Sequence, residues 1–455
     1  MADIHERLEA EDLQQNLREV QELSRGQRTA ELRANLERLH PADIAHILEA
    51  LPPEERLTVW ALVKADRDGE ILVEVSDAVR ESLIATMDRS ELVAAAETLE
   101  ADELADIAGD LPPAVIEEVV RSLSAQEREQ LRAALSFPEG SVGALMDFEH
   151  VTVREDVTLE AATRYLRRLD ELPSHTDQLF VVDRGEVLKG TLPLARLIVS
   201  DLDREVAQVL VPEQVKLHPE DRAEDAAGAF ERYDLVSAPV VDETGRLIGR
   251  LTVDAVVDYI RQRNAESQLA EGGLSQEEDI FASVAHSFRN RWAWLAVNLV
   301  TAFIASRVIG AFEGAIAQLV ALAALMPIVA GIGGNSGNQT TTMIVRAIAL
   351  NQIQGGYWAK LLGKEIGVAL LNGVVWGTLL GAIAYAFYGS VALGGVMALA
   401  MILNLLLAAL TGVGIPWLRV RLGRDPAAGS SVLLTAVTDS GGFFIFLGLA
   451  TLFLV

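Results

Sequence analysis

The feature that most constrains the fold of this 455-residue chain is an apolar run near its C-terminus, residues 431–454, which carries a single carboxylate, Asp439. A run of about 20 apolar residues is long enough to cross a bilayer as a helix. An ionised Asp at that depth costs at least about 2.5–3.5 kcal/mol on insertion scales. Water, a cation or a polar pathway must therefore stabilise Asp439, and the rest of the sequence has to indicate which.

Five stretches in the last third of the chain are apolar and long enough to span a membrane. The expected spans are Trp292–Ala311, Ala315–Leu350, Leu361–Tyr388, Val391–Trp417 and Ser431–Leu454. Residues 289–455 hold nine Lys/Arg and four Asp/Glu, and most of these bases flank alternate ends of the spans. Because basic residues mark the cytoplasmic side, we expect a multi-pass protein of the cell (inner) membrane, with cytosolic N-terminal domains and the C-terminus outside.

The first 288 residues carry most of the charge. The whole chain has 65 Asp/Glu and 38 Lys/Arg, which leaves 61 and 29 for this part and a formal charge of −32. Such a surplus argues against nucleic acid as a partner, because nucleic-acid binding needs a basic surface. It fits a solvated acidic surface or a surface that collects divalent cations. There is no cysteine, hence no disulfide or thiolate site, and residues 1–6 are unlike a signal peptide.

Residues 1–135 show helical periodicity interrupted by turn signals. Pro52-Pro53 and Pro112-Pro113 each follow an apolar segment, and Ser124 with Glu127 has the spacing of a capping box. Short helices that follow one another in this way predict a helical solenoid. We therefore expect an all-α superhelical domain over residues 1–135.

Residues 136–261 contain an internal repeat. The triplet that ends at Asp183 recurs at Asp242, and Gly190 recurs as Gly249, so both landmarks have an offset of 59 residues. Helical patterns precede each strand, which predicts two β-α-β-β-α units. They resemble a tandem pair of CBS domains, which either sense a ligand or serve as a dimerising module.

The connector, residues 262–288, joins these units to the membrane part, residues 289–455. A helix is expected to leave the second unit and to break at Gly272-Gly273. A second helical stretch is expected from Gln276 to Phe288. A helix in this place could pass a signal from a soluble sensor to the membrane helices.

The second span has a polar face that is unsuited to lipid. At helical spacing six residues share this face: Pro327, Gly331, Gly334, Asn335, Asn338 and Thr342. In the fifth span, Thr435, Asp439, Gly442 and Phe446 share another. We expect the two faces to look at each other, or across a symmetry axis, and to line a pore. The alternatives are helix packing by small residues in the second span and an ion pair of Asp439 with Arg346.

The expected pore offers oxygen ligands only. Soft metals prefer Cys or His, and the expected spans contain neither. Mg²⁺ dehydrates reluctantly and is usually held through water by one or two carboxylates, so a single Asp per subunit, doubled in a dimer, suits hydrated Mg²⁺. The spacing does not exclude Mn²⁺, Co²⁺ or a proton relay.

The order of the domains and two membrane motifs resemble the MgtE family of magnesium channels. The motifs are residues 333–339, Gly-Gly-Asn-Ser-Gly-Asn-Gln, followed by Thr342 and Arg346, and residues 438–442, Thr-Asp-Ser-Gly-Gly. The resemblance covers nearly the whole chain and implies a homodimer whose pore lies between the subunits. It implies Asp439 as the ion-binding carboxylate, with Asn338, Asn335 and the backbone near Gly334 and Thr435 beside it.

The resemblance also implies that cytosolic Mg²⁺ bound between the domains closes the pore through the connector, which is called a plug helix for that reason. The acids that match the family's sensor are Glu70, Asp102, Asp106, Glu224, Asp234, Asp258 and Glu266. The chain departs from the family at Ala255, Arg263, Ser267 and Arg222, where acids are usual. These departures should weaken divalent-cation binding at the plug, or let an Arg mimic bound Mg²⁺.

ATP is a further candidate ligand of the CBS pair. Thr252 is present after Gly249, but Ala255 takes the place of the Asp that contacts a ribose, and the matching positions of the first unit are Pro193 and Arg196. Nucleotide binding is therefore left open.

Three functions follow from these patterns. The chain is expected to be a Mg²⁺-selective channel for magnesium uptake, gated by cytosolic Mg²⁺. A secondary exchanger that moves Mg²⁺ or Co²⁺ against Na⁺ or H⁺, with Asp439 as the titrating group, is the alternative from a second class. A membrane-anchored ion sensor that transports nothing is the third. No nucleophile–base set or phosphate loop points to an enzyme.

Overall fold

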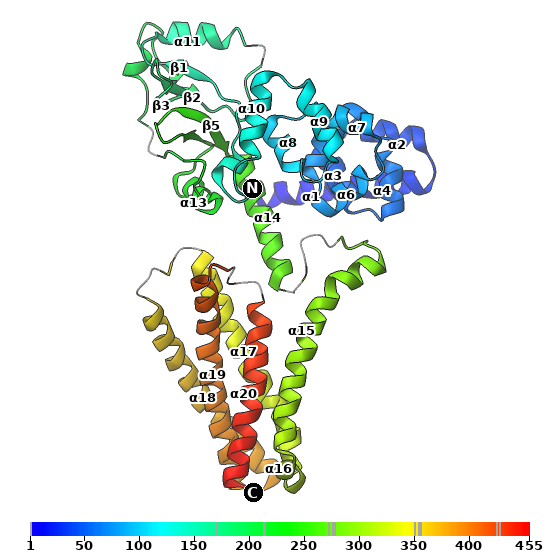
Figure 1. Cartoon of the computed structure of the whole chain (residues 1–455), viewed down its shortest axis with the longest axis vertical. Helices are drawn as coiled ribbons and strands as arrows, with labels where there is room; N and C mark the ends of the chain where they lie inside the picture. Colours follow the sequence, from blue (N-terminus) through cyan, green and yellow to red (C-terminus); the bar gives the residue numbers. More distant parts are fainter. Residues whose placement is uncertain are drawn as a thin grey trace. The chain divides into compact units, whose positions relative to one another are not determined.

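The structure is a computed structural model that describes residues 2–169, 171–212, 215–271, 274, 279–349, 352–353, 357–424, 426 and 429–455, with the backbone alone for residues 2–12, 271 and 349 (Figure 1). The chain forms two compact units. The first unit is Met1–Arg263 together with Asp279–Ala282, and the second is Asn264–Glu278 together with Ser283–Val455.

The N-terminal part of the first unit is the expected all-α array (Figure 1). Its helices are α1 (Ala2–Arg25), α2 (Thr29–Leu36), α3 (Pro41–Glu49), α4 (Pro53–Trp60), α5 (Asp68–Glu74), α6 (Asp77–Ile84), α7 (Arg89–Ala96), α8 (Ala101–Ile107), α9 (Pro113–Ser122) and α10 (Ala125–Ala134). One continuous apolar core runs through them, from Val20 to Leu131.

The helices repeat every 24 residues, more regularly than the sequence indicated. Helices α2, α4, α6, α8 and α10 begin at residues 29, 53, 77, 101 and 125. The start signals differ from one repeat to the next, which hides the period: Pro stands at the start of α4 and α9, whereas Ser124 and Glu127 form the predicted capping box of α10. The structure thus confirms the solenoid and shows its period.

Two α/β units, which form the C-terminal part of the first compact unit, follow the helical array. The first contains β1 (Thr152–Arg154), α11 (Leu159–Leu166), β2 (Gln178–Val182), β3 (Leu188–Pro193) and α12 (Leu194–Val199). The second contains α13 (Ala223–Tyr233), β4 (Ser237–Val241), β5 (Leu247–Thr252) and α14 (Val253–Glu271). Strand β2 pairs in parallel with β1 and antiparallel with β3, and β4 pairs antiparallel with β5.

The 59-residue repeat appears in the strand register. Gly190 lies opposite Val181, Gly249 lies opposite Val240, and each hairpin bulges one residue later. A side chain at Gly249 would lie 2.8 Å from the carbonyl oxygen of Asp147, so the repeated glycines permit close backbone approach. The second α/β unit departs from the expectation: in place of its first strand, the described residues form one parallel bridge, between Leu217 and Val240.

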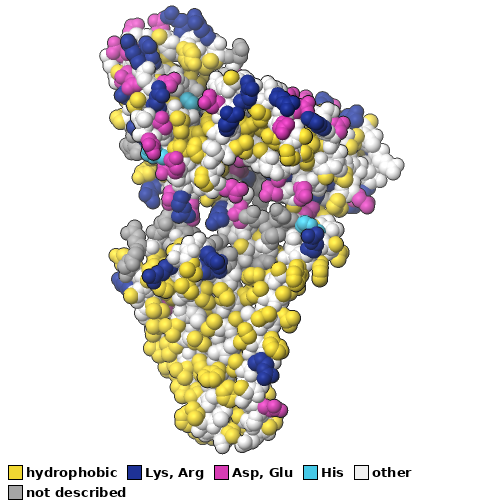
Figure 2. Space-filling view, viewed as in Figure 1, with side chains coloured by type: hydrophobic (Ala, Val, Ile, Leu, Met, Phe, Trp, Pro, Cys, Tyr) yellow, Lys and Arg dark blue, Asp and Glu magenta, His cyan; other side chains and the backbone are white. Residues whose placement is uncertain are grey.

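Long helices make up most of the second unit (Figure 1). They are α15 (Val284–Ala311), α17 (Ala321–Ala349), α18 (Trp358–Tyr388), α19 (Val391–Arg421) and α20 (Ser430–Phe453). Among the described residues, α15, α18, α19 and α20 are long and apolar enough to cross a membrane. Helix α17 packs with α19 and α20, but its glycines, amides and threonines lower its apolar character. Figure 2 shows hydrophobic side chains over these helices.

Two expected boundaries are wrong. The second span was expected as one segment from Ala315, but a short helix, α16 (Glu313–Gln318), precedes α17. The second connector helix was expected over Gln276–Phe288, but Asp279–Ser283 is not helical and α15 begins at Val284; residues 275–278 lie outside the described residues. The physical reason is capping: the Asp279 side chain accepts a hydrogen bond from the Phe281 amide (2.8 Å), and Ser283 is the N-cap of α15. Gly272-Gly273 lies outside the described residues.

Small residues bring α18 and α19 into backbone contact. A side chain at Gly381 would lie 2.5 Å from the carbonyl oxygen of Gly394, and one at Gly394 would lie 2.7 Å from that of Gly381. Gly377 meets the Ala398 backbone in the same way. This seam of glycines is the close packing that membrane helices use in the absence of a hydrophobic driving force.

Candidate functional site

The polar face of α17 is accessible in this chain. Asn335, Asn338 and Thr342 are exposed and Gly334 is half-buried, whereas Gly333 and Gly337 are buried on the other side of the helix. A side chain at Gly337 would lie 2.9 Å from Leu434 of α20. The glycines therefore pack the helix against its neighbours, and the amides are left on the open side.

Asp439 and Thr435 lie on the accessible side of α20. Asp439 is half-buried and Thr435 is exposed, whereas Leu434 and Thr438 are fully buried. Among the described residues no ion pair joins Asp439 to Arg346, so the structure gives no support to that alternative. A row of oxygen-bearing side chains on two packed helices thus remains open to a cation, to water or to a second copy of the chain.

The expectation that the two predicted faces look at each other within one chain is wrong. Helix α20 meets α17 through Leu434 and Thr438, which face Gly337 and Gly334 respectively, rather than through Thr435 and Asp439. One residue rotates a helical side chain by about 100°, which is enough to separate the two sets. That the faces meet across a symmetry axis stays a prediction.

Asn404 of α19 is a site residue that the sequence reasoning missed. Its side chain is fully buried, and its Nδ2 donates to the Val329 carbonyl oxygen of α17 (2.8 Å). It lies directly against Gly333, and a side chain at Gly442 would lie 2.9 Å from the same Nδ2. Asn404 therefore joins α17, α19 and α20 beside both motifs. The sequence signal that could have indicated Asn404 is a single amide within an apolar run of Leu and Met residues.

Gly442 and Phe446 were expected to share the pore-lining face with Asp439. Both are buried, and Gly442 faces Asn404, so the expectation is wrong for these two residues. Only the part of that face that holds Thr435 and Asp439 is accessible. Asn404 of α19 covers Gly442, and Phe446 belongs to the apolar core of these helices.

Glu365 of α18 is a buried carboxylate in the membrane helices. It is 4% exposed, it accepts a hydrogen bond from Thr340 Oγ1 of α17 (3.0 Å), and Lys364 Nζ lies 3.3 Å from its Oε1. The neighbouring Thr341 donates to the Gly412 carbonyl oxygen (3.3 Å). Glu365 therefore fixes the C-terminal half of α17 to α18, through Thr340.

The first unit holds an acidic cluster suited to a cation. Ligand oxygens of Glu100, Asp102 and Asp147 lie within 4.8 Å of one another. Asp147 also pairs with Arg250, at 2.7 Å. Three carboxylates in such a space repel one another unless protons or a hard cation such as Mg²⁺ neutralise them.

The pKa values of Glu100 and Asp102 are raised, first by burial and then by neighbouring negative charges. Burial first, and then the charge of Asp147, raises the pKa of Asp102 to about 8. Partial burial and the charges of Glu149 and Asp147 raise the pKa of Glu100 to about 7. Both carboxyls should therefore share protons near neutral pH, and a divalent cation that bound there would displace them.

A second group of acids lies where α14 meets the helical array. Burial raises the pKa of Asp106 to about 6 despite the opposing charge of Arg80, and Glu103 and Asp258 add to the rise. Burial and the charge of Asp258 also raise the pKa of Glu74. The structure thus brings the predicted residues Asp106 and Asp258 together and adds Glu74 and Glu103.

The other predicted sensor acids are not in these groups. Glu70 is exposed on α5, and Glu224 pairs with Arg222. Asp234 ends α13 in a left-handed conformation, and Glu266 belongs to the second unit. Their role as cation ligands stays a prediction. The sequence analysis did not include Glu100 and Asp147 among the cation ligands. The only local signal at Glu100 is the capping box that it forms with Glu103 at the start of α8, and that signal indicates a structural role.

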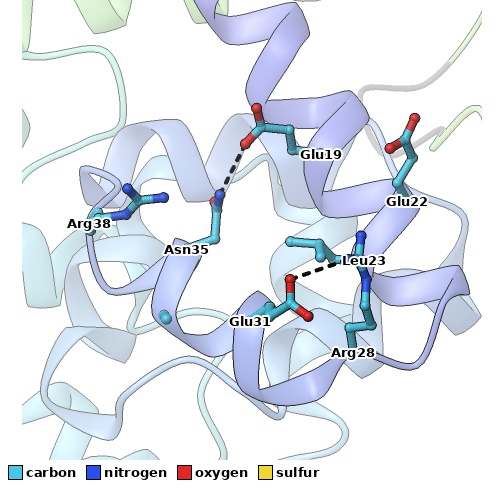
Figure 3. A pocket seen from close by; sticks show the side chains of 8 residues that line it. Glu19, Glu22, Leu23, Arg28, Glu31, Asn35 and Arg38 are labelled. Carbon is cyan, nitrogen blue, oxygen red and sulfur yellow. Dashed lines mark hydrogen bonds and ion pairs between the residues drawn. The ribbon is translucent and has the colours of Figure 1, made fainter.

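A surface pocket of 580 Å³ between α1 and α2 offers no comparable chemistry. Figure 3 shows two interactions among its side chains: Glu19 accepts a hydrogen bond from Asn35 (3.3 Å), and Arg28 forms an ion pair with Glu31 (3.3 Å). We assign no function to this pocket.

The chain is similar to known proteins along most of its length. Family models match residues 326–449 (MgtE, divalent cation transporter), residues 39–140 (MgtE intracellular N domain) and residues 206–262 (CBS domain). The magnesium transporter MgtE of Thermus thermophilus is 32% identical over 431 residues, covering 94% of this chain and 96% of the relative. The protein of the same name from Bacillus subtilis is 25% identical over 433 residues, covering 95% and 96%.

Among solved structures, the cytosolic domain of the Mg²⁺ channel MgtE in complex with ATP is 33% identical, has a TM-score of 0.48 and covers 53% of this chain and 98% of that structure. The match over the apolar helices places the chain in a class of divalent cation transporters. The chain belongs to the MgtE family of magnesium transporters.

Proposed function

We propose that this chain forms a homodimeric, Mg²⁺-selective channel for magnesium uptake whose opening is regulated by cytosolic Mg²⁺. The observation that carries the proposal is the accessible row of oxygen-bearing residues on α17 and α20: Asn335, Asn338, Thr435 and Asp439. A single chain leaves this row open on one side, which a second copy could close into a pore. The lipid bilayer then surrounds α15 and α18, and the C-terminus lies outside.

Hydrated Mg²⁺ is the substrate that suits these residues. Asp439 supplies the negative charge that compensates for a dication at membrane depth, and the amides and the hydroxyl accept from or donate to the water of the ion's hydration shell. The backbone near Gly334 can approach the hydrated ion closely, because glycine has no side chain between them. The membrane potential contributes about 2.3 kcal/mol per charge per 100 mV, so a dication gains about 4.6 kcal/mol per 100 mV on entry.

The acidic cluster of the first unit supplies the regulation. At low cytosolic Mg²⁺, Glu100, Asp102 and Asp147 repel one another and loosen the contact between α8 and the CBS pair. A bound Mg²⁺ neutralises them and stabilises the contact. Closure would follow through α14, which carries Asp258 and continues toward the connector. The remaining acids, Glu70, Glu224, Asp234 and Glu266, are proposed as weaker or accessory ligands.

Flux measurements in proteoliposomes test the pore. Asp439→Asn and Asp439→Ala are expected to abolish Mg²⁺ uptake, whereas the control Glu313→Gln, an exposed acid at the start of α16, should leave it unchanged. Persistent uptake in the Asp439 variants would remove the pore assignment. Uptake that follows voltage without a Na⁺ or H⁺ gradient supports a channel over the alternative, a secondary exchanger for Mg²⁺ or Co²⁺.

Protection from proteolysis tests the sensor. Millimolar Mg²⁺ should slow cleavage between α8 and the CBS pair in the full-length protein, and Glu100→Gln with Asp102→Asn should remove this effect. Glu117→Gln, in an exposed i,i+4 pair with Arg121 on α9, is the matched control. Equal protection in both variants would contradict the site. The same assay with ATP in place of Mg²⁺ tests the CBS pair as a nucleotide site.

A further inference from the structure

Two buried arginines occupy equivalent positions in the 24-residue repeat. Arg56 of α4 donates through Nε to the Leu48 carbonyl oxygen (2.8 Å), and Arg80 of α6 donates through Nε to the Leu72 carbonyl oxygen (2.7 Å). Each arginine and each carbonyl is displaced by 24 residues from its counterpart. We call each arginine with the carbonyl that it contacts an arginine socket: Arg56 with Leu48, and Arg80 with Leu72. The solenoid therefore contains the same arginine socket twice.

The Arg80 socket is satisfied within the helical array. Asp110, in the turn after α8, lies 2.9 Å from Arg80 Nη1, and Asp77 lies 3.2 Å from the same atom. The residue of the preceding repeat that corresponds to Asp110 is Thr86, which has no charge. The Arg56 socket thus lacks the internal acid that its twin possesses.

Asp279 of the connector fills this place. Its Oδ2 lies 2.9 Å from Arg56 Nη1, the atom that in Arg80 meets Asp110, and the two side chains are 1% (Arg56) and 12% (Asp279) exposed. The residues are 223 positions apart in the chain. Arg56 Nη2 has no hydrogen-bond partner among the described residues, so the Asp279 carboxylate is the charge that neutralises this guanidinium.

We propose that the Arg56 socket is a docking site for the connector and that its ligand is the Asp279 carboxylate. Removing one partner of a buried ion pair leaves an uncompensated charge, which is strongly unfavourable. Asp279 stands four residues before Ser283, the N-cap of α15. The helical array thereby holds the segment that leads directly into the first membrane helix, and any displacement of the array is transmitted to that segment.

Hydrogen exchange of the full-length protein in nanodiscs tests the docking without measuring transport. The Asp279→Asn variant can keep the turn, because Asn can still accept from the Phe281 amide, but it loses the charge. We expect exchange of the 279–283 amides to rise at least about tenfold, as expected for the loss of a charged hydrogen bond. A spin label at Ile280, which is 85% exposed, should become mobile in parallel; the absence of native cysteine makes this labelling specific.

Two further variants separate docking from general destabilisation. Thr86→Asp gives Arg56 an internal acid in the place of Asp110, so it should release the connector although both docking residues are intact. Asp110→Asn, the matched control, breaks the twin socket and should loosen α6 and α8 while leaving 279–283 protected. Unchanged exchange of 279–283 in Asp279→Asn or in Thr86→Asp would overturn the proposal. Because no ion flux is read, this result and a failure of the proposed channel are independent.

Discussion

Gly333 of α17 is the position where one added methyl group should be most damaging. A side chain there would overlap the amide of Asn404, well inside van der Waals contact. Asn404 cannot retreat easily, because it is fully buried and the other side of its amide faces Gly442, where an added side chain would lie 2.9 Å away. We therefore expect Gly333→Ala to separate α17 from α19.

The magnitude follows from two contributions. Overpacking of a well-packed interior costs about 1–3 kcal/mol. Displacement of Asn404 would also break its hydrogen bond to the Val329 carbonyl oxygen, which contributes about 1 kcal/mol and leaves buried polar groups unsatisfied. The expected loss is thus about 2–4 kcal/mol in the free energy of unfolding of the membrane helices.

The assay is thermal or denaturant unfolding of the purified protein in detergent, followed by size-exclusion chromatography. Gly395→Ala is the control, because a side chain at Gly395 of α19 meets nothing within 4 Å; it should be neutral or slightly stabilising. The double variant Gly333→Ala/Asn404→Ala should recover part of the loss, since the clash is gone. A Gly333→Ala protein as stable as the Gly395→Ala protein would refute the reasoning.

Three further outcomes are expected. In Mg²⁺-free buffer the first unit should lose stability as pH rises from 6 to 8.5. The pKa of Asp102 is raised from 3.8 to about 8, so the folded state binds more protons than the unfolded state in this range. Calorimetry of the Asp102→Asn variant should therefore show a smaller loss of stability over the same range. Glu365→Gln should retain the bond from Thr340 and most of the flux, whereas Glu365→Leu should strand the Thr340 hydroxyl and reduce thermal stability by about 1–3 kcal/mol. Ser124→Ala should cost about 1 kcal/mol by removing the N-cap of α10, as measured by urea unfolding.

The sequence was sufficient for features that rest on local or repeated signals. The 59-residue offset of Gly190 and Gly249 is visible because both glycines meet the same backbone demand in each hairpin. The capping box at Ser124 is a local arrangement within one helical turn. The apolar length of the membrane helices is likewise a property of each helix by itself.

Features that depend on packing between distant segments could not be predicted. Periodicity places Asp439 and Thr438 on adjacent faces, but which face meets α17 depends on which side chains interdigitate with Gly334 and Gly337. Nothing near Asn404 in the sequence indicates that two glycines from other helices surround it. Asp147 and Glu100 are 47 residues apart, and only the tertiary fold brings them together.

The 24-residue period of the helical array makes its length adjustable in whole steps. Because α2, α4, α6, α8 and α10 begin at a constant interval, insertion of one complete repeat after α6 would preserve every neighbouring contact of the type already present. The socket at Arg56 would then keep its place near the N-terminal end, while the acids on α8 would move by one repeat. The distance between α4, which holds the connector through Arg56, and α8, which carries the acidic cluster, could thus be changed in steps of one repeat. Such insertions would measure how the coupling between docking and cation binding depends on that distance.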